Sequence, residues 1–194
     1  MPLPTEPIGS IPRPRELLAA LDAYRAGRID LAGLDAAYDA AVEDTVRRFE
    51  ATGSPVITDG EQRKPSFLTY PLQLLDTLAA DGLTIAFADG HARQLPRLIR
   101  GPFRYAAYAD AYLERARRFA HRPMKQAVIG APALSLLYPR GGIPDYPESA
   151  FLSDLKREVA LDIRRCFDRG ADSVQIDFTE GRLAVKLDPS KALL

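Results

Sequence analysis

Residue types that often carry chemistry are scarce in this chain of 194 residues, which has one cysteine, two histidines and no tryptophan. A single cysteine cannot build an internal disulfide framework, and this indicates a reducing compartment such as the cytoplasm. Cys166, His91 and His121 are too few and too scattered to have the spacing of a zinc site. Cys166 lies in a stretch with helical periodicity, where we expect a small, buried apolar residue.

The chain also lacks an excess of charge and a long apolar run. Its 26 basic and 26 acidic residues cancel to a formal net charge of zero, which argues against binding nucleic acid by neutralising many phosphates. No apolar run approaches the roughly 20 residues of a membrane span. The opening MPLPTEPIGSIPRP lacks the basic start and apolar core of a signal peptide. We therefore expect a soluble cytoplasmic protein that binds neither nucleic acid nor a membrane.

Proline and glycine separate short apolar runs from longer stretches with helical periodicity. Helices are predicted over residues 15–26, from a cap at Asp30 to about residue 52, over 105–121 and over 147–169. Strands are predicted over 55–58, 125–129, 173–176 and 182–187, with a further strand pair over 83–87 and 94–99. This order of elements is typical of an α/β fold with a parallel sheet. No linker or repeat divides the chain, so residues 1–194 are expected to form one domain.

Polar side chains stand where such folds place their binding groups, just past the carboxyl ends of strands. Asp59 and Glu61 follow the strand predicted over 55–58, and Asp177 follows the strand over 173–176. Near the start of the chain, Gly9 and Ser10 offer backbone N–H groups and a hydroxyl in a turn, which suits a carboxylate ligand. An ordinary turn or cap is the alternative explanation for each segment taken alone.

Taken together, these segments resemble the motifs of one family. Residues 8–14, Ile-Gly-Ser-Ile-Pro-Arg-Pro, are similar to the IGSFPR opening of the catalytic barrel of cobalamin-independent methionine synthase. Residues 52–63, TGSPVITDGEQR, resemble the second-strand motif of that barrel, and residues 175–177, Gln-Ile-Asp, resemble its QIDEP segment. Each motif is short, but their order and spacing fit together, and the resemblance extends from end to end of the chain.

The resemblance implies a (β/α)₈ barrel of the TIM-barrel type. A typical barrel needs about 250 residues, so this chain would hold only about the first five β/α units, as the N-terminal part of a truncated barrel. The implied activity is that of a 5-methyltetrahydropteroyltriglutamate–homocysteine S-methyltransferase, which passes a methyl group from a folate donor to the thiol of homocysteine in methionine biosynthesis. Zinc is implied as the cofactor that activates the thiol. The family's zinc ligands, a His-x-Cys pair, a Glu and a later Cys, have no counterpart in this sequence.

Matched residue by residue, the resemblance also assigns an amino-acid site. Ile8, Gly9 and Ser10 match the segment that holds the homocysteine carboxylate. Glu61 matches the acid that pairs with the amino group, and Asp177 matches a second amino-acid contact. An amino-acid zwitterion needs hydrogen-bond donors at one end and carboxylates at the other, which agrees with these residue types. No protein nucleophile is expected, because the substrate's own thiolate attacks the methyl donor.

Weaker matches concern the folate. Arg97 and Leu98 stand near a folate-contacting position, and Tyr138 stands about where the family stacks an aromatic ring on the pterin. Leu183 stands near the place of an acid that contacts the folate. In this the chain resembles the short stand-alone members of the family, whose methyl donor or thiol substrate can differ. Two alternatives stay open. One is a non-catalytic truncated paralogue or fragment whose open barrel edge is covered by a second copy or a partner chain; the other is a zinc-dependent thiol alkyltransferase of the coenzyme M type.

Overall fold

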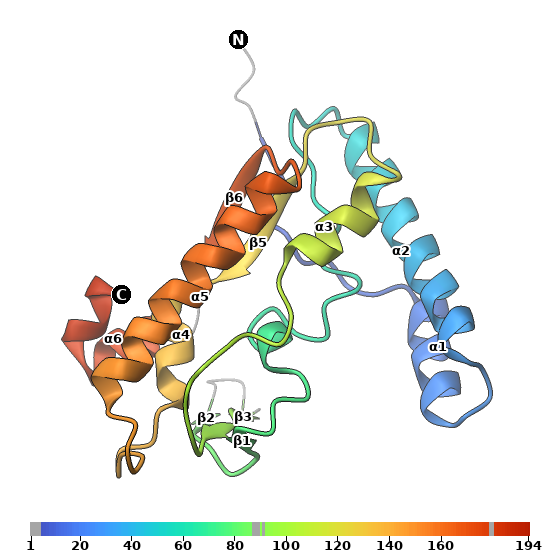
Figure 1. Ribbon diagram of the computed structural model, residues 1–194. Helices are drawn as coiled ribbons and strands as arrows, with labels where there is room; N and C mark the ends of the chain where they lie inside the picture. Colours follow the sequence, from blue (N-terminus) through green and yellow to red (C-terminus); the bar gives the residue numbers. More distant parts are fainter. Residues whose placement is uncertain (1–4, 87–89, 91, 179–180) are drawn as a thin grey trace. The chain divides into compact units, whose positions relative to one another are not determined.

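The structure is a computed structural model that describes residues 5–86, 90, 92–178 and 181–194 (Figure 1). The contacts within the chain define two compact units, each assembled from three segments. Unit 1 comprises residues 1–67, 109–127 and 164–175, and unit 2 comprises residues 68–108, 128–163 and 176–194. None of the described helices is long and apolar enough to cross a membrane.

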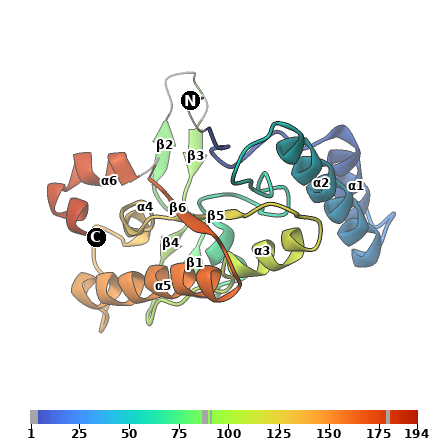
Figure 2. The same ribbon diagram turned by 90° about the horizontal axis from the view of Figure 1, so that it is seen from above.

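Unit 1 is built around its longest helix. Helix α2 (Leu31–Ala51) begins where the sequence predicts, because the Asp30 side chain accepts a hydrogen bond from the N–H of Gly33 at 2.9 Å and caps the first turn. Helix α1 (Arg15–Arg25) contacts α2 and runs beside it (Figures 1 and 2). The buried face of α2 repeats at helical spacing and consists of Leu34, Ala41, Val42, Thr45 and Val46.

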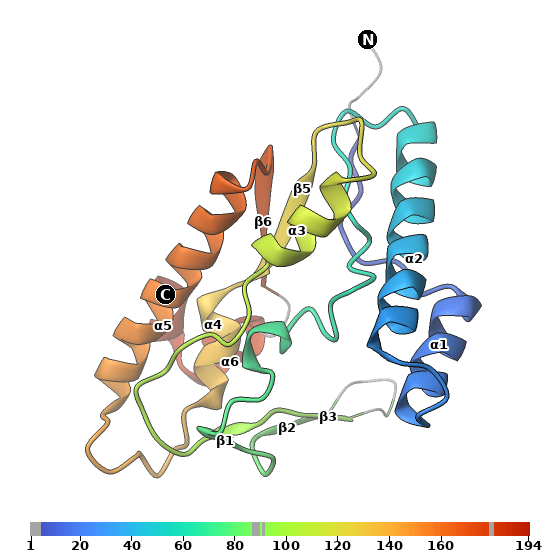
Figure 3. The same ribbon diagram turned by 45° about the vertical axis from the view of Figure 1, so that its right-hand side comes forward.

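Parallel strand pairing joins segments that are far apart in the sequence. Strands β5 (Lys125–Ile129) and β6 (Ser173–Asp177) pair in a two-stranded sheet and lie side by side in Figures 1 and 3. The Met124 carbonyl accepts a hydrogen bond from the N–H of Asp172, and the Asp177 carbonyl accepts one from the N–H of Gly130, so both strands run in the same direction. This parallel pair agrees with the predicted α/β class.

The strand predicted over 55–58 is reduced to one parallel bridge between Ile57 and Met124. The reason lies in the residues that follow Ile57. The Thr58 hydroxyl donates a hydrogen bond to the Gly9 carbonyl at 3.2 Å, and the Gly60 carbonyl accepts one from the N–H of Ile11 at 3.1 Å. The chain therefore leaves the sheet at Thr58 and binds the N-terminal segment instead.

Unit 2 combines short antiparallel strands with helices. The predicted strand pair is right in part, because β2 (Thr84–Ala86) pairs with β3 (Ala92–Gln94), whereas β4 (Arg97–Leu98) pairs with β1 (Leu78–Ala79) (Figure 2). Phe87 and the predicted turn at His91 lie outside the described residues. The remaining helical elements of this unit are η1 (Tyr70–Leu72), α4 (Ala131–Leu134), η2 (Ser135–Leu137), α6 (Gly181–Leu187), η3 (Pro189–Leu193) and most of α5 (Glu148–Asp168).

Two predicted elements are corrected. The strand predicted over 182–187 is wrong, since these residues form α6, whose buried Ala184 lies on the face that contacts α4. A short apolar run fits a strand or a helix equally well, and packing decides between them. The helix predicted over 105–121 is shorter, and only α3 (Asp110–Arg117) forms.

The residues before α3 bind acidic side chains of α5 instead of continuing a helix. Within unit 2, the N–H of Phe103 donates a hydrogen bond to Asp154 at 3.1 Å, and the N–H of Tyr105 donates one to Glu158 at 3.1 Å. The Tyr146 hydroxyl also donates to Asp154, at 2.7 Å. Burial alone would raise the pKa of Asp154, but hydrogen bonds from Tyr146, Arg157 and Arg104 outweigh it and lower that pKa below its ordinary value.

Candidate functional site

Glu61, in the turn after Ile57, is a buried acidic residue of unit 1 with an unusual backbone conformation. Its side chain is only 8% exposed, and its backbone adopts a positive φ of 55°. Such a conformation is uncommon for a residue with a side chain and persists where the surroundings hold it. The Glu61 N–H donates a hydrogen bond to Oδ1 of Asp59 at 2.8 Å, which closes the turn. Glu61 thus has a fixed backbone and a shielded carboxylate.

Gly9 lies directly against this carboxylate. A Cβ atom built on Gly9 would stand 3.1 Å from Oε1 of Glu61 and 3.9 Å from Nε2 of Gln175. Gly9 is buried, whereas Ile8 and Ser10 are exposed. Within the described part of the chain, the N–H groups of Gly9 and Ser10 make no hydrogen bond. The turn therefore presents unused donors beside an acidic side chain.

Lys64 places a positive charge on the other oxygen of Glu61. Its Nζ lies 3.4 Å from Oε2 of Glu61 and donates a hydrogen bond to the Ala127 carbonyl at 2.6 Å. The lysine is 2% exposed. A buried charge is tolerated when it is paired and hydrogen-bonded, and here each charge compensates the other. Nothing in the sequence pattern singled out Lys64, because a lysine in a polar turn usually lies in solvent.

Arg63 fixes the same turn to helix α2. Its guanidinium forms ion pairs with Asp35 and with Asp39, the latter at 2.8 Å, and its Cζ lies 4.9 Å from the centre of the Tyr38 ring. Arg63 is largely buried, so its side of these contacts is shielded from solvent. The side chain points to the helix and serves the shape of the turn rather than a ligand.

Asp177, the second predicted amino-acid contact, belongs to unit 2. It ends β6, is partly exposed, and its carbonyl accepts the N–H of Gly130 at 2.9 Å. The structure thus brings Gly9 and Glu61 together within unit 1, with Ser10 next to Gly9 in the chain. The role of Asp177 in holding the same amino acid stays a prediction.

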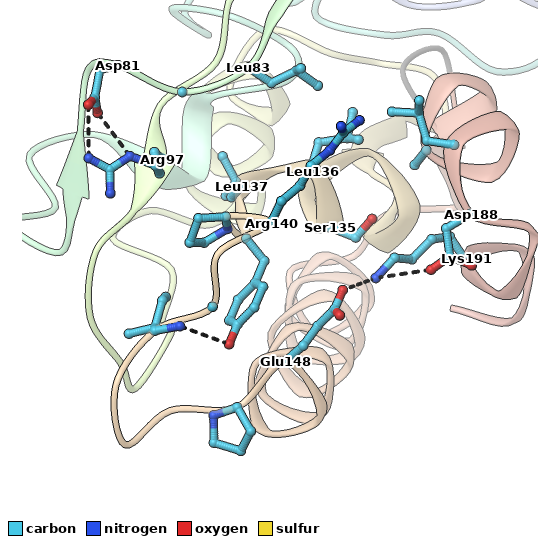
Figure 4. Close-up of a pocket in the computed structure, with 18 residues that line it drawn as sticks. Asp81, Leu83, Arg97, Ser135, Leu136, Leu137, Arg140, Glu148, Asp188 and Lys191 are labelled. Carbon is cyan, nitrogen blue, oxygen red and sulfur yellow. Dashed lines mark hydrogen bonds and ion pairs between the residues drawn. The ribbon is translucent and has the colours of Figure 1, made fainter.

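A cavity of about 900 Å³ in unit 2 is lined by two of the residues predicted to contact folate. Arg97 donates from Nε and Nη2 to the carboxylate of Asp81, at 3.1 and 2.9 Å. The Tyr138 ring stacks on Phe151, with ring centres 5.4 Å apart. Figure 4 shows the Asp81–Arg97 pair on one side of this cavity and Lys191, paired with Glu148 and Asp188, on the other. Leu98 is fully buried and does not line the cavity.

The residues that the structure describes do not fit the implied zinc ion. They contain no group of three His, Cys, Asp or Glu side chains that could hold a metal. Cys166 is fully buried in α5, as expected of a packed apolar residue, and His91 lies outside the described residues.

No family model matches the chain. The 5-methyltetrahydropteroyltriglutamate–homocysteine methyltransferase of Corynebacterium efficiens is 27% identical over 183 residues, which cover 91% of this chain and 23% of that protein. The enzyme of the same name from Aeromonas salmonicida is 38% identical over 77 residues, which cover 40% of this chain and 10% of that protein.

The fold of this chain also resembles that of a solved structure. A B12-independent methionine synthase from Shewanella sp. W3-18-1, solved in complex with selenomethionine, matches with a TM-score of 0.70 and 16% identity over 92% of this chain and 52% of that chain. The chain therefore spans about half the length of that solved chain and a quarter or less of these curated relatives. The likeness confirms the predicted fold class, an α/β fold of the TIM-barrel type. The chain is thus similar in sequence to part of the 5-methyltetrahydropteroyltriglutamate–homocysteine methyltransferases and in fold to part of a B12-independent methionine synthase.

Proposed function

We propose that this chain supplies the amino-acid-binding part of a cobalamin-independent methionine synthase, which transfers a methyl group from a folate donor to the thiol of homocysteine. The observation that carries the proposal is the close approach of Gly9 to the shielded Glu61 carboxylate. Two kinds of relative support it. The curated relatives are named homocysteine methyltransferases, and the Shewanella protein was solved with selenomethionine, an analogue of the methionine product.

The two ends of homocysteine would meet different groups of unit 1. Its carboxylate would accept hydrogen bonds from the N–H groups of Gly9 and Ser10 and from the Ser10 hydroxyl, in the manner of a backbone anion site. Its ammonium would donate to Oε1 of Glu61, a charge-assisted hydrogen bond. Because Gly9 has no Cβ, the ligand can approach the backbone closely.

The buried lysine completes the charge balance of this arrangement. Lys64 compensates Glu61 when no ligand is bound, so the carboxylate stays paired in the empty protein. The ammonium of the substrate would then add a second cation to the same carboxylate, on the oxygen that faces Gly9. Holding both ends of the amino acid leaves its side chain, and hence its sulfur, directed away from the turn.

The methyl donor would bind in the cavity of unit 2. Its lining offers one aromatic ring, Tyr138, two arginines, Arg97 and Arg140, and several apolar side chains, which suits a flat ring system that carries carboxylates. In the reaction, a bond forms between the thiolate sulfur and the methyl carbon while the bond from that carbon to the donor breaks. The donor itself leaves with the electron pair of the broken bond.

Calorimetric titration of the chain with L-homocysteine, L-methionine and L-selenomethionine tests the amino-acid site. We expect all three to bind and Glu61→Gln to weaken each of them by about tenfold or more, since a hydrogen bond between charged groups is lost. Glu16→Gln, at an exposed position of α1, is the matched control and should bind as the unchanged chain does. Undiminished binding by Glu61→Gln would contradict the proposal.

The non-catalytic alternative makes a different prediction with the same ligands. A chain that holds the amino acid without turning it over binds methionine but forms none from homocysteine and a methylfolate, with or without added zinc. Its support is that the described residues offer no group able to hold a metal. A methyl-transfer assay on the purified chain separates the two functions.

A further inference from the structure

Arg13 joins the two halves of the proposed amino-acid site. It stands in the first motif, four residues after Gly9, yet its guanidinium reaches the turn that carries Glu61. Its Nε donates to the Gln62 carbonyl at 3.1 Å, and its Nη2 donates to the carbonyl of Lys64. One side chain therefore holds the carbonyl groups of Gln62 and Lys64, both of which follow Glu61 in the turn.

Further hydrogen bonds connect the segment that contains Gly9 with the turn that contains Glu61, nearer to the groups that would bind the ligand. The N–H of Ile11 donates to the Gly60 carbonyl, and the Thr58 hydroxyl donates to the carbonyl of Gly9. These contacts precede Glu61 in the turn, whereas the contacts of Arg13 follow it. Glu61, in its left-handed conformation, is thus held from both sides by the segment that contains Gly9.

We propose that Arg13 is a positioning residue that sets the distance between the backbone N–H groups of Gly9 and Ser10 and the carboxylate of Glu61. Arg13 thereby makes the site selective for ligands that carry a carboxylate and an ammonium on the same carbon. The inference rests on the proposed function, because it concerns the same site. Arg13 does not touch the ligand itself, but the spacing that it sets selects α-amino acids over ligands with only one of the two charged groups.

The chemistry of arginine explains why this residue type stands here. The guanidinium is planar and donates from separate nitrogens in fixed directions, so it can hold two carbonyls at a set spacing. A lysine keeps the charge but has a single nitrogen on a flexible stem, so it cannot reproduce that geometry. Arg13→Lys therefore changes spacing while it leaves charge and approximate size unchanged.

A purely stabilising role for Arg13 would have a different signature. If the variant only loosens the fold, every ligand of the site should lose affinity by the same factor. If Arg13 sets spacing, only a ligand that must reach both halves at once is affected. Ligands with one end bind to one half and do not sense the distance between the halves.

The experiment compares L-methionine with two one-ended analogues, 4-(methylthio)butanoate, which lacks the ammonium, and 3-(methylthio)propylamine, which lacks the carboxylate. Calorimetry measures all three on the unchanged chain, on Arg13→Lys and on the control Arg25→Lys, whose exposed ion pair with Asp22 lies in α1. We expect Arg13→Lys to raise the Kd of L-methionine about tenfold and to leave the Kd of both analogues unchanged. Thr58→Val removes a second connection between the halves and should give the same pattern.

Hydrogen exchange of the Ile11 amide, measured by NMR without ligand, tests the positioning role of Arg13 independently of whether an amino acid binds. Faster exchange in Arg13→Lys than in Arg25→Lys supports the positioning role even if no amino acid binds, in which case the proposed function alone fails. Unchanged exchange overturns the positioning role. Where L-methionine binds the unchanged chain, equal losses for all three ligands, or no loss for L-methionine in Arg13→Lys, overturn it as well.

Discussion

Gly9 and Glu61 stand so close that a methyl group on Gly9 would lie 3.1 Å from Oε1 of the glutamate. The two residues come from motifs at opposite ends of unit 1's first segment. Their approach depends on the absence of a side chain at position 9 and on the positive φ of Glu61. The missing side chain at Gly9 therefore leaves the space beside Glu61 that the ammonium of a ligand would enter.

Gly9→Ala should weaken the binding of L-methionine by about tenfold or more, because the added methyl group displaces the Glu61 carboxylate or occupies part of the ligand's space. Calorimetry measures the loss. Gly141→Ala is the matched control, since a Cβ atom at Gly141 meets no atom within 4 Å. Equal affinities for the two variants would show that Gly9 does not border the ligand.

Lys64→Met should destabilise the fold by about 3–5 kcal/mol, because it removes the buried cation that lies against the buried Glu61 carboxylate. Urea unfolding gives the free energy. Adding Glu61→Leu to this variant should recover much of the loss, since no uncompensated charge then remains. Arg47→Met, which removes an exposed partner of Glu43, is expected to cost less than about 1 kcal/mol.

Acid should remove part of the stability of the unchanged chain through Asp154. Its pKa is lower in the folded chain than in the unfolded one, so its contribution is present above the unfolded pKa and is lost as the pH falls through the folded pKa. Asp154→Asn lacks this contribution at every pH. The difference in free energy of unfolding between the two proteins should therefore shrink on acidification. A difference that stays constant from neutral pH to about pH 3 would contradict this assignment.

Tyr138→Leu should weaken the binding of 5-methyltetrahydrofolate by about tenfold, through the loss of an aromatic surface in the cavity of unit 2. The side chain also makes structural contacts, since its hydroxyl donates to the Tyr146 carbonyl at 2.8 Å. Tyr138→Phe removes this hydrogen bond but keeps the ring, and it should bind the folate almost as the unchanged chain does. Similar losses in both variants would point to a structural role.

Local signals in the sequence were sufficient for much of the fold. The Asp30 cap and the apolar spacing of α2 lie within the helix itself, so the helix was predicted to within a residue or two at each end. The apolar residues Ala127, Val128 and Ile129, which end at Gly130, marked β5 equally clearly. The seven residues of α6 fit the apolar spacing of a strand as well as that of a helix, so the sequence alone does not predict this helix. Its contact with α4 favours the helix.

The site divides in the same way. Gly9 and Glu61 could be found because their motifs resemble those of a known family. Lys64 could not, since its burial depends on the Ala127 carbonyl, which lies far along the chain in β5. Arg13 was visible in the first motif, but its function follows from two carbonyls in the second. Long-range hydrogen bonds, which no local pattern encodes, distinguish these residues.

The pairing of Lys64 with Glu61 has a consequence for how the site responds to salt. The pair carries no net charge, and an amino acid at neutral pH carries none either. Binding therefore brings together two partners without net charge, the Lys64–Glu61 pair and the zwitterionic amino acid. No counterions need to be released. The affinity for L-methionine should accordingly change little between low and physiological ionic strength, unlike that of a site that recognises its ligand by an excess of one charge.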